Sequence, residues 1–282
     1  MWSFIISFSS KYNLSDKSIV SSIDDLSLWS APFGLKLLDQ IEYKNNITVL
    51  DIGSGFGFPS IEIASRLGDT CKVFGIDPWK EANQRASVKI KSWGLNNIKI
   101  IDAVAESIPF DNDQFELITS NNGLNNVEND EKTFSEIARV AKAGAQLVFT
   151  INLQETMIEF YNIYKSVLVK NNLNDEIEKL SEHIFKKRKP LKYTINLVEK
   201  NGFHIYKIIE DEFYLRYTDG TSMLNHFFIK LAFKESWFNI LSPEISSSIY
   251  NELEYELNKV SRQTGSIKLK VPYVCINAVK IN

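Results

Sequence analysis

Apolar residues along the chain follow two periods, and the changes between them predict alternating strands and helices. A continuous apolar run at residues 47–52, rich in β-branched side chains, predicts a strand buried on both faces, as in a parallel sheet. Apolar positions over 61–67 then follow a helical period that ends at Gly68, and Pro59 suits the first helical position. The same alternation predicts strands at 72–77, 98–101, 115–119 and 146–151, and helices at 81–93 and 130–141. This spacing predicts a parallel sheet with right-handed crossovers over 46–152.

The order of elements changes after residue 152. The pattern predicts helices at 154–170, 174–189 and 191–200, a strand at 203–217, a helix opened by Ser242 and Pro243, and strand segments at 267–271 and 274–279. The fold class predicted from the whole chain is α/β, with a seven-stranded, mostly parallel sheet and helical insertions.

We expect one α/β domain under a helical cover, although 282 residues would also allow two small domains. The expected segments are an N-terminal helical cap at 1–45, a core at 46–152, a helical insertion at 153–190, and the completion of the sheet at 191–282 with a helical lid insertion at about 218–265.

Composition excludes several classes of protein. The hydrophobic fraction of 44% suits a globular chain and excludes wholesale disorder. The net charge of −3 disfavours general nucleic-acid binding, because that affinity comes largely from lysines and arginines on phosphates. Cys71 and Cys275 are the two cysteines, too few for a disulfide scaffold or a four-cysteine zinc site. No His, Cys and Asp cluster has metal-ligand spacing, so we expect no metal.

Several features predict a cytoplasmic protein. The low cysteine count suits a reducing compartment, and no apolar run approaches the ~18 residues that a membrane span requires. The apolar residues 1–6 have no basic residue before them, unlike a secretory signal, so we expect a mature protein. Lysine far exceeds arginine, and Ile and Asn are abundant, which indicates an AT-rich, bacterial source.

A glycine-rich loop follows the first predicted strand. Gly53, Gly55 and Gly57 alternate with other residues, which allows a tight turn and close approach of the backbone to a ligand. The third glycine falls one place earlier than in the dinucleotide fingerprint. Asp77 ends the second strand 20 residues after Gly57, a spacing at which an acid can reach ribose hydroxyls.

Asp51, two residues before the first glycine, narrows the choice of ligand. A carboxylate there would repel a pyrophosphate but suits a ligand with a cationic head and a ribose. S-adenosylmethionine has an amino group, a sulfonium and an adenosine. The alternative is that Asp51 only ties the turn together through backbone N–H groups.

Four ordered segments together resemble a known family. They are Asp-x-Gly-x-Gly-x-Gly at 51–57, Phe74–Asp77, Ala105–Asp111 and Glu136–Gly144. These resemble the motifs of class I S-adenosylmethionine-dependent methyltransferases, of the ubiquinone/menaquinone-biosynthesis (type 11) variety. The resemblance covers 46–152 and implies a Rossmann-like sheet, with S-adenosyl-L-methionine as cofactor and S-adenosyl-L-homocysteine as product.

The resemblance also implies site residues. Gly53 and Gly55, with Ser54 between them, would lie along the methionine part, and Asp51 would support its amino group. On the adenosine side the implied residues are Asp77 for the ribose, Pro78 and the Ala105 N–H for the adenine, and Glu106 beside it. The backbone at Ser120 and Asn121 would face the amino group or the methyl donor.

The chain departs from the family pattern at three places. Val104 stands where relatives often have an Asp for the adenine amino group, and Ala143 replaces a usual Pro. Asparagines dominate residues 121–126, where relatives often carry a His. The Asn/Asp-Pro-Pro-Tyr/Phe signature of base- and glutamine-amino methyltransferases is absent, which disfavours DNA and protein-amide substrates.

Three features outside these motifs are candidates for the site. Trp29 could attract a sulfonium with its aromatic face, or only fasten the N-terminal segment to the sheet. His226, in the expected lid insertion, is the candidate catalytic base, with a packing role as the alternative. Residues 186–189 are three lysines and an arginine, best explained as a solvated helix end that favours the dipole, with a phosphate or nucleic-acid patch as the minor alternative.

The predicted function is methyl transfer from S-adenosylmethionine to a small, partly apolar acceptor by in-line displacement. A non-catalytic S-adenosylmethionine-binding regulator or partner subunit is the alternative, because of the asparagine run. An NAD(P)-dependent reductase is less favoured, given Asp51, the displaced glycine and the lack of a Tyr-x-x-x-Lys pair. We expect neither a nucleic-acid partner nor a membrane span, and the sequence does not distinguish a monomer from a homodimer.

Overall fold

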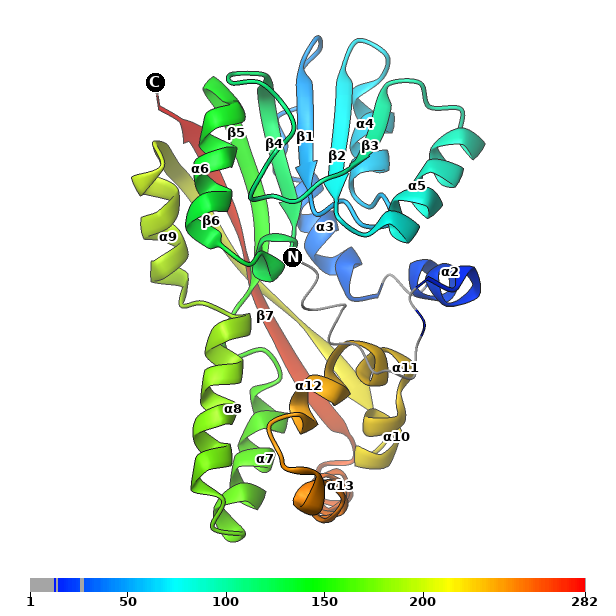
Figure 1. Ribbon diagram of the computed structural model, residues 1–282, viewed down its shortest axis with the longest axis vertical. Helices are drawn as coiled ribbons and strands as arrows, with labels where there is room; N and C mark the ends of the chain where they lie inside the picture. The colour runs from blue at the N-terminus through cyan, green and yellow to red at the C-terminus, as the bar shows by residue number, and fades with distance from the viewer. Residues whose placement is uncertain (1–12, 14, 26–27, 282) are drawn as a thin grey trace.

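The computed structural model describes residue 13 and residues 15–25 and 28–281, which form two lobes (Figure 1). The upper lobe is a sheet flanked by helices, and the lower lobe is a group of helices around the ends of two long strands. The strands are β1 (Thr48–Ile52), β2 (Lys72–Asp77), β3 (Ile98–Asp102), β4 (Phe115–Asn121), β5 (Ala141–Asn152), β6 (Phe203–Tyr217) and β7 (Ile267–Lys280).

The strands form a single sheet in the order β3-β2-β1-β4-β5-β7-β6. β1 to β5 run parallel to one another, and β7 is antiparallel to both β5 and β6. The predicted α/β fold with a seven-stranded, mostly parallel, Rossmann-like sheet is therefore confirmed.

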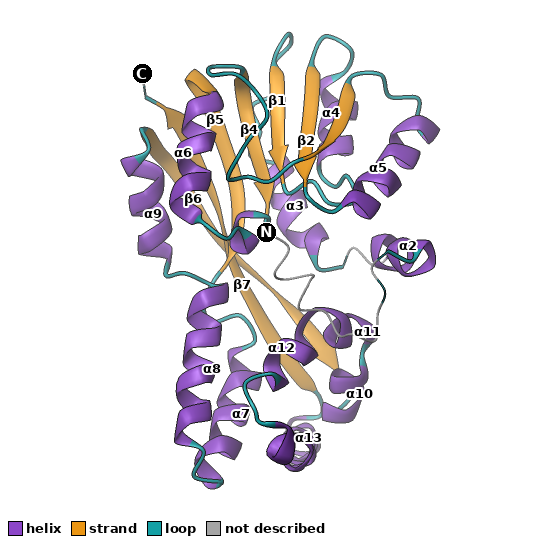
Figure 2. Cartoon of the chain, viewed as in Figure 1, coloured by secondary structure: helices purple, strands orange, loops and turns teal. Residues whose placement is uncertain are grey.

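Helices cover both faces of the sheet, with α6 and α9 in front and α3 and α4 behind (Figure 2). The helices of this lobe are α3 (Ser30–Leu38), α4 (Ser60–Leu67), α5 (Lys80–Ser92), α6 (Asp130–Val140) and α9 (Leu191–Lys200). In β1, Val49 packs with α3 and α4, whereas Leu50 packs with α6 and α9. This burial on both faces explains why the β1 sequence is continuously apolar.

The N-terminal segment packs beside the sheet. Its helix α2 (Lys17–Asp25) contacts α5, where Asp24 forms ion pairs with Arg85 at 2.7 Å and Lys89 at 2.6 Å. The remaining parts of the expected cap, residues 1–12, 14 and 26–27, lie outside the described residues.

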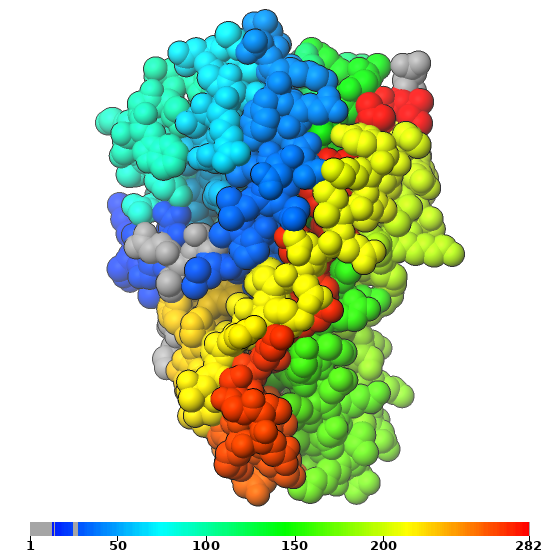
Figure 3. All heavy atoms as spheres, turned by 180° about the vertical axis from the view of Figure 1, so that it is seen from behind, coloured from blue at the N-terminus to red at the C-terminus, as the bar shows by residue number. Residues whose placement is uncertain are grey.

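β6 and β7 connect the two lobes. Within β7, only Tyr273–Val279 pair with β5, whereas the full length of β7 pairs with β6. The free ends of β6 and β7 therefore leave the sheet as a two-stranded ribbon, and from behind β6 forms a yellow diagonal band between the lobes (Figure 3). The predicted segments at 267–271 and 274–279 are one continuous strand.

The lower lobe has its own hydrophobic core. The lobe contains α7 (Ile158–Lys170), α8 (Asn174–Lys187), α10 (Gly220–Asn225), α11 (Phe227–Ile229), a π-helical turn (Lys230–Lys234), α12 (Glu235–Phe238) and α13 (Pro243–Thr264). Phe160, Trp237, Leu253 and Leu257 pack there against Leu269 of β7. The helices expected within 153–190 and 218–265 thus share one core.

Two helix starts differ from prediction for local reasons. α4 begins at Ser60, because Pro59 stands just before the helix and its carbonyl oxygen accepts from the Ile63 N–H at 2.9 Å. α7 begins at Ile158, because Met157 has a left-handed φ of 59° that a helix interior does not accommodate. In the described part of the chain, no helix is long and apolar enough to cross a membrane.

Candidate active site

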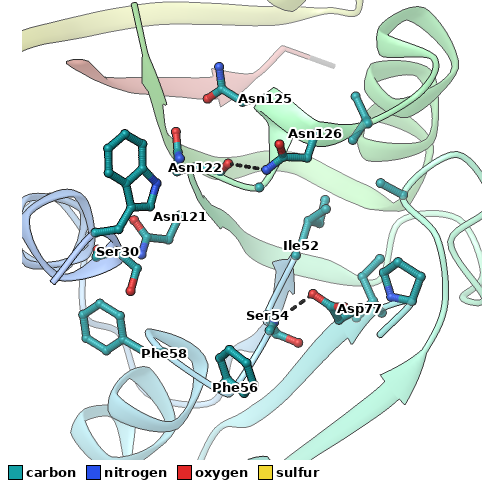
Figure 4. A pocket seen from close by; sticks show the side chains of 18 of the residues that line it. Ser30, Ile52, Ser54, Phe56, Phe58, Asp77, Asn121, Asn122, Asn125 and Asn126 are labelled. Carbon is teal, nitrogen blue, oxygen red and sulfur yellow. Dashed lines mark hydrogen bonds between the residues drawn. The ribbon is translucent and has the colours of Figure 1, made fainter. Parts of the chain in front are cut away.

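A cavity of about 280 Å³ lies at the carboxyl ends of β1, β2 and β4 (Figure 4). Ligands of open parallel sheets bind at this edge. The predicted site residues that line the cavity are Trp29, Gly53, Ser54, Gly55, Asp77, Pro78, Ala105, Glu106 and Asn121. Asp51, Ser120 and His226 do not line it.

The glycine loop leaves β1 and bends over the end of β2. The N–H groups of Gly53 and Ser54 both donate to the Ile76 carbonyl, at 2.9 and 3.1 Å. Gly53 and Gly55 have φ values of 75° and 51°, and a Cβ added at Gly55 would enter open space. The backbone at Gly55 can therefore be approached closely by a ligand.

Ser54 places an unsatisfied hydroxyl at the wall of the cavity. Its side chain is 1% exposed and lies against Gly75 of β2, and its hydroxyl has no hydrogen-bond partner among the described residues. Buried hydroxyls in folded proteins are nearly always hydrogen-bonded. The unused hydrogen-bonding capacity of Ser54 therefore lies beside the cavity.

Asp77 connects the glycine loop to α5. One carboxylate oxygen accepts from the Gly55 N–H at 2.8 Å, and the other accepts from the Trp79 N–H at 2.8 Å. Figure 4 shows the side chain beside Ser54 at the cavity wall. The Asp77 carboxylate thus orders the backbone of the glycine loop and the start of α5 at this edge of the cavity.

Asp51 lies beneath the cavity instead of at its surface. It is fully buried, accepts from the Thr119 hydroxyl at 2.7 Å, and accepts a short hydrogen bond from the Ser60 hydroxyl. Direct support of a ligand amino group by Asp51 is therefore not what the structure shows. The residue ties β1 to β4 and α4, and its partners are side-chain hydroxyls, not the backbone N–H groups of the alternative explanation.

Burial raises the pKa of Asp51 to about 6, despite the two hydroxyl donors that favour its charged form. The unfolded chain releases this proton near pH 4, whereas the folded chain keeps it until about pH 6. The associated stability is therefore present at low pH and lost as pH rises through about 6. Two pKa units correspond to about 3 kcal/mol.

We predict that Asp51→Asn removes this pH dependence. Relative to the native chain, the variant should gain up to about 3 kcal/mol in free energy of unfolding between roughly pH 4 and pH 7. Urea unfolding at several pH values measures the difference. Asp69→Asn, at an exposed position, is the matched control, and its difference in free energy of unfolding from the native chain should not change with pH. A constant difference for Asp51→Asn would contradict the raised pKa.

Asn121, at the end of β4, and the asparagines that follow it form another wall of the cavity. Asn121 donates to the Ser30 carbonyl at 3.1 Å, and thus holds α3 at the cavity. The side-chain oxygens of Asn122 and Asn125 both accept from the Asn152 N–H at 3.2 Å. These asparagines line the cavity. Their place at the carboxyl end of a buried strand could have indicated this from the sequence, because ligands bind at that edge of a parallel sheet.

Two predicted residues, Ser120 and His226, do not line the cavity. The Ser120 hydroxyl is buried and donates to the Ile52 carbonyl at 2.8 Å. His226 is exposed, and its ring packs on Tyr217 with 5.2 Å between ring centres. Partial burial lowers the pKa of His226. His226 therefore packs on Tyr217 outside the cavity, which supports its packing role and not a role as base.

Trp29 lies between the cavity and a cluster of aromatic side chains. It lines the cavity, and its ring lies 5.5 Å from Phe33 and from Phe233, and 5.6 Å from Phe228. The aromatic cluster joins α3 to the lower lobe and closes one end of the cavity with apolar surface.

The lower lobe contributes cavity residues that sequence reasoning missed. Phe228 comes from α11, and Lys187 and Arg188 come from the end of α8. Arg188 is 3% exposed, so the interpretation of this helix end as solvated is wrong for Arg188. Within the described residues, no three His, Cys, Asp or Glu side chains are arranged to hold a metal ion.

Comparison with known proteins identifies the family. A family model described as a methyltransferase domain matches residues 43–212. The demethylmenaquinone methyltransferase of Geobacillus sp. (strain WCH70) is 33% identical over 115 residues, 41% of this chain and 49% of the relative. The sarcosine/dimethylglycine N-methyltransferase of Halorhodospira halochloris is 30% identical over 107 residues, 38% of each chain. The chain spans about half the length of the curated demethylmenaquinone methyltransferases it matches.

Solved structures agree on the fold. The YcgJ protein from Bacillus subtilis superposes with a TM-score of 0.57 at 18% identity, covering 89% of this chain and 98% of that one. The geranyl diphosphate C-methyltransferase from Streptomyces coelicolor A3(2) superposes with a TM-score of 0.55 at 14% identity, covering 98% and 87%. With the family match across more than half of the residues, these findings confirm the resemblance in the motifs: the chain belongs to the methyltransferase domain family, of the class I S-adenosylmethionine-dependent type.

Proposed function

We propose that this chain binds S-adenosylmethionine in the cavity and transfers its methyl group to a small-molecule acceptor. The observation that carries the proposal is the arrangement of Asp77, Ser54 and Gly55 around one edge of the cavity. An acid at the end of β2, an unsatisfied buried hydroxyl and an unobstructed glycine backbone suit a ligand that has a ribose and a polar amino-acid part.

Each part of the cofactor has residues suited to hold it. Asp77 would accept from the ribose hydroxyls, and Pro78 and Ala105 would lie against the adenine. The Gly53–Gly55 backbone and the Ser54 hydroxyl would hold the methionine part. The methionine part would thus lie at the end of β1, the ribose at the end of β2, and the adenine at the segment after β3.

The bound cofactor supplies a methyl group on a sulfonium, which is activated for in-line displacement. The protein then has to orient the acceptor and exclude water. Trp29, Phe58 and Phe228 provide apolar walls for this purpose, and the asparagines after β4 provide polar groups that can orient an acceptor. None of the described lining residues is a histidine, so the proposal assigns no general base.

Three finer proposals accompany this function. The net charge of −3 favours a small-molecule acceptor over nucleic acid, and the free, buried Cys71 and Cys275 are consistent with a cytoplasmic, bacterial enzyme. Residues 46–152 would form the cofactor-binding core. The segments at 1–45, 153–190 and 218–265 would form the cover that selects the acceptor.

Ligand-induced stabilisation tests the function. S-adenosylmethionine and S-adenosylhomocysteine should each raise the melting temperature in proportion to the logarithm of ligand concentration, because they bind the folded chain. NADPH should not shift it, since the Asp77 carboxylate would repel its 2′-phosphate and the third glycine is displaced from the dinucleotide fingerprint. Stabilisation by NADPH alone would refute the proposal.

A further inference from the structure

A buried cation with an unused hydrogen-bond donor lines the cavity. Arg188 directly follows α8, and the Nη1 atom of its guanidinium has no hydrogen-bond partner in the described part of the chain. The guanidinium lies 5.8 Å from the ring centre of Tyr161, a contact that satisfies no N–H group. An unsatisfied buried donor on a charged group is costly to a fold. It therefore marks a place where a ligand oxygen is expected.

A second cation lies next to the first. Lys187 also lines the cavity and is partly buried. Burial, together with the charges of Lys186 and Arg188, lowers the pKa of Lys187 to about 8. Two consecutive cations therefore line this wall of the cavity, and a bound anion would interact with both.

The carboxylates of the cavity are already engaged elsewhere. Asp24 pairs with Arg85 and Lys89, and Asp77 accepts from two backbone N–H groups. Glu106 accepts from the N–H groups of residues 128 and 129, at 2.7 and 3.2 Å. None of them satisfies Nη1 of Arg188, so this donor is left for a ligand oxygen.

Arg188 lies away from the proposed ribose site. Asp77 ends β2, whereas Tyr161 belongs to α7, which follows β5. β2 and β5 are separated by β1 and β4, so three strand spacings, about 14 Å, lie between them. In Figure 1 the chain from α8 to α9 passes between the lobes on the β5 side. The cation therefore belongs to the wall of the cavity that the lower lobe provides, on the β5 side.

We propose, resting on the function above, that the methyl acceptor carries an oxyanion and that Arg188 binds it together with Lys187. A planar guanidinium suits a carboxylate or a phosphate, because both can accept two parallel N–H bonds. Anchoring of the anionic end would turn the rest of the acceptor toward the Asn121–Asn126 wall and the methyl donor.

Anion titration of the full chain tests this inference. Inorganic phosphate and benzoate serve as probes at constant ionic strength, with and without saturating S-adenosylhomocysteine. Arg188→Gln should weaken binding of the preferred anion by about 10- to 100-fold. Arg188→Lys should retain part of the affinity, more than Arg188→Gln, because it keeps the charge but not the two parallel N–H groups. Lys186→Gln, an exposed position on the same helix end, should change the affinity by about twofold at most.

The outcomes separate the two proposals. A native chain that binds S-adenosylhomocysteine but neither anion overturns the inference alone, and one that binds no S-adenosylhomocysteine contradicts the proposed function. Equal losses in Arg188→Gln and Lys186→Gln would indicate non-specific attraction and overturn the inference. A loss of S-adenosylhomocysteine affinity of about tenfold or more in Arg188→Gln would instead assign the cation to the cofactor carboxylate. Far-UV circular dichroism of Arg188→Gln and Arg188→Lys confirms folding.

Discussion

Replacing Asp77 with alanine should weaken the binding of S-adenosylhomocysteine by about 10- to 100-fold. The substitution removes the acceptor proposed for the ribose hydroxyls. It also releases the N–H groups of Gly55 and Trp79, which the carboxylate holds at 2.8 Å each. The loop would then have to be ordered by the ligand, which adds to the loss. Isothermal titration calorimetry measures the dissociation constant directly.

Asp102 provides the matched control for this substitution. It ends β3, the strand next to β2, and its exposed side chain does not line the cavity. Asp102→Ala should leave the affinity within about twofold. If Asp77→Ala bound S-adenosylhomocysteine as tightly as the native chain, the ribose role of Asp77 would be refuted.

Truncation of Trp237 to alanine should lower the free energy of unfolding by about 3–5 kcal/mol. Trp237 is fully buried in the lower lobe and stacks on Phe160 with 4.0 Å between ring centres. Its indole N–H donates to the Tyr161 hydroxyl at 3.0 Å. The variant would leave a cavity in that core and an unsatisfied hydroxyl beside Arg188. Urea unfolding monitored by circular dichroism measures the change.

Trp93 serves as the control because its side chain is 58% exposed at the end of α5. Trp93→Ala should change the free energy of unfolding by no more than about 0.5 kcal/mol. Since β6 and β7 run through both lobes, we expect the native chain to unfold in one transition. Comparable losses in the two variants would contradict the description of the lower-lobe core.

Much of the upper lobe could be predicted because its signals are local. Strand period, β-branched runs and the glycines after β1 mark the sheet and the cavity edge without knowledge of distant contacts. The 20-residue spacing to Asp77 is also a local measure, since it spans one helix and one strand. These features place Gly53, Gly55 and Asp77 at the cavity.

Whether Asp51 lies at the cavity or beneath it depends on the face of β1 from which its side chain projects. Side chains alternate along a strand, so Asp51 shares a face with Val49, the face that α4 covers. Spacing from the glycines identifies Asp51 as near the loop but does not say that α4 encloses it. The alternation of side chains along β1 would have predicted that Asp51 faces α4.

Arg188 was missed because its burial depends on contacts between the lobes. Cations at a helix end are usually solvated, and nothing within residues 174–189 indicates otherwise. The burial follows from the ribbon of β6 and β7, which holds the lower lobe against the cavity edge. The unusual length of these strands was visible in the sequence, but their departure from the sheet was not.

A crystal structure with S-adenosylhomocysteine bound would show directly whether the cavity holds the cofactor. We expect the adenosine to lie across the glycine loop, with the ribose hydroxyls within hydrogen-bond distance of the Asp77 carboxylate and the sulfur toward the Asn121–Asn126 wall. S-adenosylhomocysteine bound outside this cavity, or inside it with the ribose away from Asp77, would refute the proposed cofactor site.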